Sequence, residues 1–142
     1  MKYNVTLFLF YVVNFLFSQN IVLNPSFESY NECPTKKGAF NSNVTHWSTS
    51  NYGTTDYFNA CNTNDLCGNY NFIGHQKART GNGYAGFYTF APDSYKEYVQ
   101  GQLKTTLIKG RNYTISFYIS LSDCSSHATK TLGVLLDRKS VV

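Results

Sequence analysis

The stretch NYTISFYISLS, residues 112–122, indicates the fold class of this chain. Apolar side chains alternate along it with smaller or more polar ones, which is the period of a β-strand with one apolar and one wetter face. The apolar set is Tyr113, Ile115, Phe117, Ile119 and Leu121. The preceding segment contains Gly110, which suits a tight reversal of the chain. We therefore expect a strand whose apolar face, with Phe27 nearby, fills a core between two sheets.

The rest of the chain also favours an all-β fold. It holds 12 Tyr, 11 Phe and 10 Gly, and aromatic residues suit pleated surfaces while glycine suits turns. No segment shows a convincing apolar period of about 3.6 residues, which would indicate a helix. Further strands are expected at residues 20–29, 83–90, 96–103 and 131–136, with short ones at 44–48 and 71–74.

Residues 1–18 are predicted to be a signal peptide. Lys2 precedes an apolar run of the length that secretory signals use, and Ser18 is a small residue at a plausible cleavage position. The run is interrupted by Asn14 and is short for a membrane helix, which needs about 20 apolar residues; a retained anchor helix is the alternative. We expect the mature chain, residues 19–142, to lie outside the cytoplasm, with no membrane span.

The charge distribution argues against nucleic acid as a partner. Without residues 1–18 the chain keeps 11 basic and 8 acidic residues. The basic residues are scattered along the sequence, whereas nucleic-acid binding needs a concentrated basic face.

Cysteines are expected to fasten a long loop between residues 29 and 80. Structureless loops of about fifty residues are uncommon in compact domains, and cysteines in an oxidising compartment form disulfides by default. A bond between Cys33 and Cys61 would close this loop on itself, while Cys67 and Cys124 are left either paired or free. A zinc site is the rival, but the cysteine spacings match no usual ligand pattern.

The order of several motifs resembles a known family. NIVLNPSFE, VTHWS, GNGYAGFYTF, YVQGQL and LIKGRNYTISFYISLS follow one another as in the galactose-binding-like jelly roll of carbohydrate-binding modules. ECP, TTDYFNAC and the pattern G-x-Q-x-A-x-x-G-x-x-Y-x-G at residues 74–86 also resemble the N-terminal domain of some exported OmpA-family proteins of Gram-negative bacteria. The resemblance spans residues 20 to about 136.

The resemblance implies an antiparallel β-sandwich of the jelly-roll type. A jelly roll needs about eight strands, and the chain ends soon after the fifth or sixth that the sequence indicates, so a sandwich incomplete at its C-terminus is expected. The implied function is that of an exported, non-catalytic binding module for glycan or another cell-envelope component. The alternative is a structural, protein-interacting β-sandwich of an outer-membrane protein that binds no sugar.

The aromatic and amide-rich loop is the candidate binding region. Sugar sites combine aromatic faces with a few oriented polar groups, and binding residues concentrate on loops. The candidate ligand-binding residues are Trp47, Asp56, Tyr57, Phe58, His75, Gln76 and Arg79. The wider set of suitable side chains in this loop also includes Tyr52, Asn59, Tyr70 and Phe72. The alternative is that these aromatic side chains give the loop a small core of its own, and that Trp47 fills the core.

No cofactor is indicated, with a structural calcium ion at Glu28 kept as an alternative because calcium takes oxygen ligands. Catalysis is not expected. The sequence contains no G-x-S-x-G or H-E-x-x-H pattern. Its acidic residues are spread out, with no sign of the facing carboxylate pair that glycoside hydrolysis uses.

Overall fold

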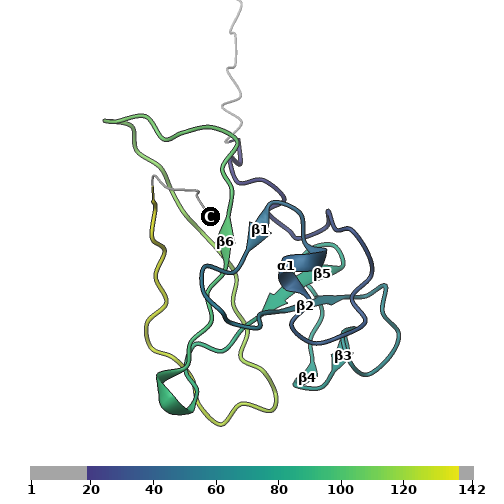
Figure 1. The fold of residues 1–142 in the computed structure, drawn as a ribbon. Helices are drawn as coiled ribbons and strands as arrows, with labels where there is room; N and C mark the ends of the chain where they lie inside the picture. The colour runs from purple at the N-terminus through teal and green to yellow at the C-terminus, as the bar shows by residue number, and fades with distance from the viewer. Residues whose placement is uncertain (1–18, 138–142) are drawn as a thin grey trace, which may run out of the picture.

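A computed structural model of the protein describes residues 19–137 and shows a β-rich chain with little helix (Figure 1). The predicted signal peptide, residues 1–18, lies outside the described residues. The elements are α1 (Phe40–Asn43), β1 (Trp47–Ser48), β2 (Asp56–Asn59), β3 (Tyr70–Asn71), β4 (Gly74–His75), β5 (Gly83–Gly86), the 3₁₀ turn η1 (Pro92–Ser94) and β6 (Gln100–Gly101). Among residues 19–137 the strands form three small antiparallel sheets of two strands each.

The pair β2–β5 lies at the centre of the fold. All four residues of β2 are buried, so this strand shows no alternation between a wet and a dry face. The partner strand β5 has glycine at two positions where other groups approach its backbone closely. A Cβ at Gly83 would lie 2.7 Å from the carbonyl oxygen of Phe27, and a Cβ at Gly86 would overlap the ring of Phe58. The Phe58 ring stacks on Tyr84, with centroids 5.1 Å apart.

Residues 100–104 pair with two other segments in succession. β6 pairs with β1, and the Gln102 amide donates to the carbonyl of His46 at 3.0 Å. Further along the same segment, the Leu23 amide donates to the Gln102 carbonyl at 2.9 Å, and Val22 bridges Leu103. The N-terminal segment predicted as a strand at 20–29 is therefore reduced to this bridge, and the strand predicted at 96–103 to β6 and its extension.

The core is formed largely by the segment predicted to be a long loop. Phe40, Val44 and Tyr57 are buried together, and Phe27 and Trp47 pack against them. Helix α1 was not expected from the sequence, because four residues are too short to show a helical period. Phe40 and Asn43, three residues apart on one face of α1, are the residues that it buries.

The disulfide between Cys33 and Cys61 is confirmed, with the Cα atoms 6.0 Å apart. Cys67 is free and buried, and Cys124 is free and exposed. Burial raises the pKa of the Cys67 thiol, and the nearby Asp56 charge raises it further, so this thiol stays protonated and unreactive at neutral pH. Both short strands expected inside the loop are present in part. The one predicted at 44–48 corresponds to β1, and the one predicted at 71–74 corresponds to the β3–β4 hairpin.

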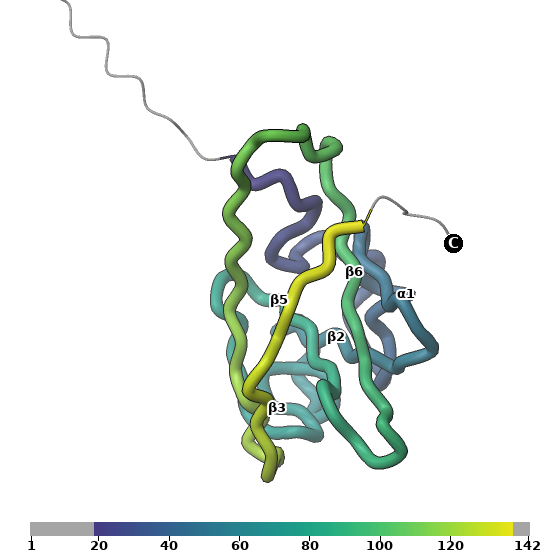
Figure 2. Tube along the Cα trace, turned by 90° about the vertical axis from the view of Figure 1, so that its left-hand side faces the viewer, coloured from purple at the N-terminus to yellow at the C-terminus, as the bar shows by residue number. Residues whose placement is uncertain are grey.

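The prediction that residues 112–122 form a strand with its apolar face in the core is wrong. The five apolar side chains of this segment are 40–67 % exposed, and no residue of 102–137 belongs to a strand. Figures 1 and 2 show residues 112–122 as part of a long extended stretch outside the labelled strands. A strand requires hydrogen-bonded neighbours, and no segment within 19–137 pairs with residues 112–122. The same holds for the strand predicted at 131–136.

None of the helices described in residues 19–137 has the length and apolar character required to cross a bilayer.

The position of the core is tested by comparing two phenylalanines. Phe40 is fully buried and Phe117 is 52 % exposed. We expect Phe40→Ala to lower the free energy of unfolding by about 3–5 kcal/mol, because it leaves a cavity in the core. Phe117→Ala should cost less than about 1 kcal/mol, because the surface side chain it removes packs against little. Urea unfolding followed by fluorescence measures both, and a larger loss for Phe117→Ala would restore residues 112–122 to the core.

Candidate functional site

The residues predicted to bind a ligand do not form one site. Tyr57 and Phe58 are fully buried, and Asp56 is 7 % exposed, so all three side chains belong to the interior around β2. Trp47 lies at the edge of the core, and His75, Gln76 and Arg79 lie on the surface around and beyond β4. Each of these groups has a different set of contacts.

The Tyr57 hydroxyl links the core to the N-terminal segment that contains Phe27. It donates to the carbonyl oxygen of Phe27 at 2.8 Å and accepts from the side-chain amide of Asn59 at 2.7 Å. Burial raises the pKa of Tyr57 to about 12, so the hydroxyl remains a donor over the physiological range. A ligand on the surface has no access to this group.

Asp56 ties β2 to the turn before α1. Its Oδ1 accepts a hydrogen bond from the Gly38 amide at 2.7 Å. Burial raises the pKa of the Asp56 carboxyl; the Gly38 hydrogen bond opposes this shift, and the nearby Glu97 charge adds to it. The role of Asp56 is therefore structural, and its ionised form is disfavoured by folding.

Trp47 is packed inward and fully hydrogen-bonded. The indole Nε1 donates to the carbonyl oxygens of Leu23 and Asn24, at 3.1 and 2.9 Å. The ring lies 4.8 Å from the Phe27 ring and covers Gly101, where a Cβ would approach it to 2.7 Å. These contacts match the alternative in which this tryptophan fills the core.

Gln76 and Arg79 contact the extended segment that follows residue 112. The Ser120 hydroxyl donates to Gln76 Oε1 at 2.7 Å, and the Arg79 guanidinium lies 4.7 Å from the centroid of the Tyr118 ring. These two surface side chains thus fasten the C-terminal part of the described chain to the β4 region.

His75, together with Tyr70 from the wider set of candidate side chains, lines an open surface hollow, which we call the loop hollow. It has a volume of about 360 Å³. The residues that line it are Ala60, Asn62, Thr63, Asn64, Asn69, Tyr70, His75 and Lys77. Strands β3 and β4 pair Tyr70 directly with His75, and the two rings stack with centroids 4.1 Å apart and an interplanar angle of 15°.

The walls of the loop hollow are held by hydrogen bonds. Asn62 donates from Nδ2 to the Pro34 carbonyl at 2.5 Å and accepts from the Asn64 amide at 2.7 Å. The Gln76 amide donates to the Asn69 carbonyl at 2.9 Å. The disulfide at Cys61 joins the same loop to Cys33, so the loop that lines the hollow is tied to the rest of the chain at several points.

Several polar groups of the loop hollow are free to meet a ligand. The side-chain amides of Asn64 and Asn69, the Tyr70 hydroxyl and the His75 ring nitrogens make no hydrogen bond to another residue of 19–137. The Tyr70 side chain is 63 % exposed. An exposed aromatic face with adjacent planar amides is an arrangement that can stack on a sugar ring and bond its hydroxyl groups.

Asn64, Asn69, Thr63 and Lys77 were missed as site residues by the sequence analysis. The density of asparagine between Cys61 and Asn71 was the available signal. It could not be separated from ordinary turn composition without the β3–β4 hairpin, which places Tyr70 and His75 together.

Glu28 has a structural contact of its own. Its Oε1 accepts hydrogen bonds from the amides of Asn82 and Gly83, at 2.7 and 2.8 Å, and the carboxylate lies over Gly81, whose φ is +68°. It thereby fixes the turn that enters β5. Within residues 19–137 no group of three His, Cys, Asp or Glu side chains is arranged to hold a metal ion.

No protein-family model, curated protein or solved structure matches this chain.

The pH dependence of stability tests the environment of Asp56. Because folding raises the pKa of this carboxyl, its contribution is fully present below the unfolded pKa and is lost as the pH rises through the folded pKa. Asp56→Asn removes this titration and keeps an oxygen that can accept from Gly38. We expect the stability of the variant relative to wild type to increase between about pH 4 and about pH 7 in urea unfolding. A difference that is the same at both pH values would contradict the assignment.

The contact of Glu28 is tested by removing the carboxylate. We expect Glu28→Ala to lower the free energy of unfolding by about 1–2 kcal/mol, because two charge-assisted hydrogen bonds to the backbone are lost. Glu32→Ala, which changes an exposed carboxylate on the same segment, is the control and should have little effect. The melting temperature should not depend on added calcium or EDTA; a calcium-dependent rise that Glu28→Ala abolishes would favour the calcium alternative.

Proposed function

We propose that this chain is an exported, non-catalytic binding module that recognises glycan, or another cell-envelope component, through the loop hollow. The observation that carries the proposal is the stacked pair of Tyr70 and His75, exposed beside the free amides of Asn64 and Asn69. The C–H face of a pyranose ring packs on the exposed face of the aromatic pair. The amides, each a donor and an acceptor, bond the hydroxyl groups at its edge.

The setting of the hollow supports a binding role. It lies on a loop, where binding residues concentrate when a rigid scaffold positions them. The scaffold here is the buried strand β2, which leads directly into the loop, and the Cys33–Cys61 bond. A site already held in shape loses less conformational freedom when a ligand binds.

Export is supported by the disulfide and by the predicted signal peptide. Disulfides persist in oxidising compartments and are rare in the cytosol. We place the mature protein outside the cytoplasm, at the cell envelope or beyond it. We also place its β-rich body in the galactose-binding-like jelly-roll class, close to the N-terminal domains of exported OmpA-family proteins, on the order of the motifs.

The second candidate is a protein-interacting module without sugar binding. The observation that favours it is the exposed apolar side chains of residues 113–121, which are 50 % exposed or more at Ile115, Phe117 and Ile119. Contiguous exposed apolar surface marks protein contact sites. None of these side chains lines the loop hollow.

A glycan array followed by titration of the positive ligands tests the proposed function. We expect weak binding, with a Kd of about 0.1–1 mM, because a shallow hollow contacts few ligand atoms and each contributes little. Tyr70→Ala should weaken binding about tenfold, since stacking of a nucleic-acid base on an aromatic side chain contributes about 1–3 kcal/mol and a pyranose face would pack on Tyr70 in a similar way. Tyr88→Ala removes a tyrosine that is 49 % exposed and lies outside the hollow, so it should leave the affinity unchanged.

Two outcomes would contradict the proposal. Glycan binding that survives both Tyr70→Ala and His75→Ala would move the site away from the loop hollow. Binding to no glycan, combined with specific capture of an envelope protein that Phe117→Ala abolishes, would favour the protein-interacting candidate.

A further inference from the structure

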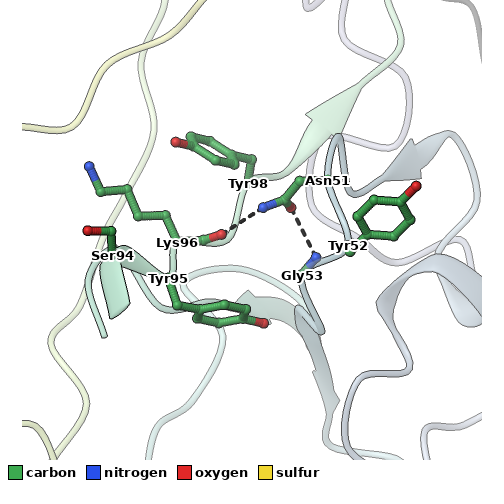
Figure 3. A pocket seen from close by; sticks show the side chains of 7 residues that line it. All are labelled: Asn51, Tyr52, Gly53, Ser94, Tyr95, Lys96 and Tyr98. Atoms are coloured by element: carbon green, nitrogen blue, oxygen red, sulfur yellow. Dashed lines mark hydrogen bonds between the residues drawn. The ribbon is translucent and has the colours of Figure 1, made fainter. Parts of the chain in front are cut away.

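We propose that the chain carries a second ligand site, a tyrosine cleft, that prefers saccharides bearing an anionic group. The cleft lies between residues 51–53 and 94–98 and has a volume of about 470 Å³ (Figure 3). Its side chains are those of Asn51, Tyr52, Ser94, Tyr95, Lys96 and Tyr98. It shares no lining residue with the loop hollow, so either site can exist without the other.

A buried carboxylate fixes the two walls of the cleft. Glu97 is 3 % exposed. Its Oε1 accepts from the Thr54 amide and from the Tyr95 hydroxyl, each at 2.8 Å, and its Oε2 accepts from the Tyr88 amide at 2.8 Å. The side chain of Glu97 therefore joins the segment before β2 to the segment before β6.

A second set of hydrogen bonds closes the base of the cleft. Asn51 donates from Nδ2 to the Lys96 carbonyl at 2.7 Å and accepts from the Gly53 amide at 3.2 Å (Figure 3). Both walls are thus held by side chains whose bonds are internal to the protein. The backbone of both walls is therefore held in place before any ligand arrives.

The aromatic rings of the cleft are open to solvent. Tyr52 is fully exposed, Tyr98 is 50 % exposed and Tyr95 is 38 % exposed. The hydroxyls of Tyr52 and Tyr98 make no hydrogen bond to another residue of 19–137. Three exposed tyrosines from two separate segments around one hollow offer apolar faces for sugar C–H groups and hydroxyls for sugar oxygens.

The charge of the cleft selects the class of saccharide. Lys96 lines the cleft, and no acidic residue does. The Glu97 carboxylate beneath it is buried and hydrogen-bonded to the protein. In Figure 3 the Lys96 side chain extends on the same side as Ser94 and Tyr98. Its ammonium group is a compact positive charge with three donors, suited to a carboxylate or sulfate on a sugar that packs on the rings.

The size of the preference follows from the exposure of Lys96. A solvent-exposed ion pair changes affinity by about two- to fivefold. We therefore expect a modest preference for the anionic form of a saccharide over its neutral counterpart, and we expect this preference to weaken as salt is added.

Two probes with matched neutral forms test the proposal by NMR titration of the exported chain. The probes are an oligogalacturonate with its methyl ester, and a sulfated chondroitin oligosaccharide with its desulfated, methyl-esterified form. We expect at least one anionic probe to shift the ring resonances of Tyr95 and Tyr98, with an affinity about two- to fivefold higher than that of its neutral form. Lys96→Gln should remove the preference and Lys96→Arg should keep it, because arginine retains the charge.

Control variants separate this site from the loop hollow. Tyr98→Ala should weaken binding at the cleft about tenfold, whereas Tyr70→Ala should leave the cleft titration unchanged. The proposal is overturned if neither anionic probe shifts the cleft tyrosines, if neutral and anionic forms bind there equally, or if the preference survives Lys96→Gln. None of these results bears on neutral-glycan binding at Tyr70 and His75, which the array measures independently.

Discussion

The burial of β2 against β5 is the constraint on which the rest of the structure depends. Four consecutive residues of β2 are buried, so the strand runs through the interior with both faces covered. The chain reaches the surface at each end of this strand. Residues 51–53, which precede it, form one wall of the tyrosine cleft, and residues 60–64, which follow it, form one wall of the loop hollow. Any loss of the β2–β5 pairing would disturb both surfaces together.

Polar side chains in the interior give this arrangement its specificity. Asn59 donates to the Tyr57 hydroxyl and accepts from the Cys61 amide at 2.9 Å, while Asp56 accepts from Gly38. Such groups are costly to bury unless they are paired, so they favour the one packing that pairs them. Glu97 extends the same principle to the tyrosine cleft. The hydroxyl of Thr55 is the exception, since it is buried without a partner among the described residues.

The sequence analysis succeeded where the decisive information is local or covalent. The bond between Cys33 and Cys61 was predicted because it closes the long loop on itself, and the short strand at Trp47 and the glycine-rich strand β5 were predicted from residue type. The strand prediction failed at residues 112–122. An alternating pattern of apolar side chains describes which way the side chains point, but it does not show which segment supplies the hydrogen bonds that a strand needs. The sequence analysis also placed Tyr57 and Phe58 in a binding surface, since a fully buried strand between two loops has no pattern that separates it from those loops.

Hydrogen exchange of the backbone amides, measured by NMR without ligand, tests most directly the claim that a rigid β2–β5 body holds preformed hollows. We expect the slowest exchange at residues 56–59 and 83–86. We also expect measurable protection at the amides of Asn64 and Gln76, which hold the walls of the loop hollow. Residues 112–122 should exchange rapidly. Slow exchange at residues 112–122, with fast exchange through β2 and β5, would contradict this account.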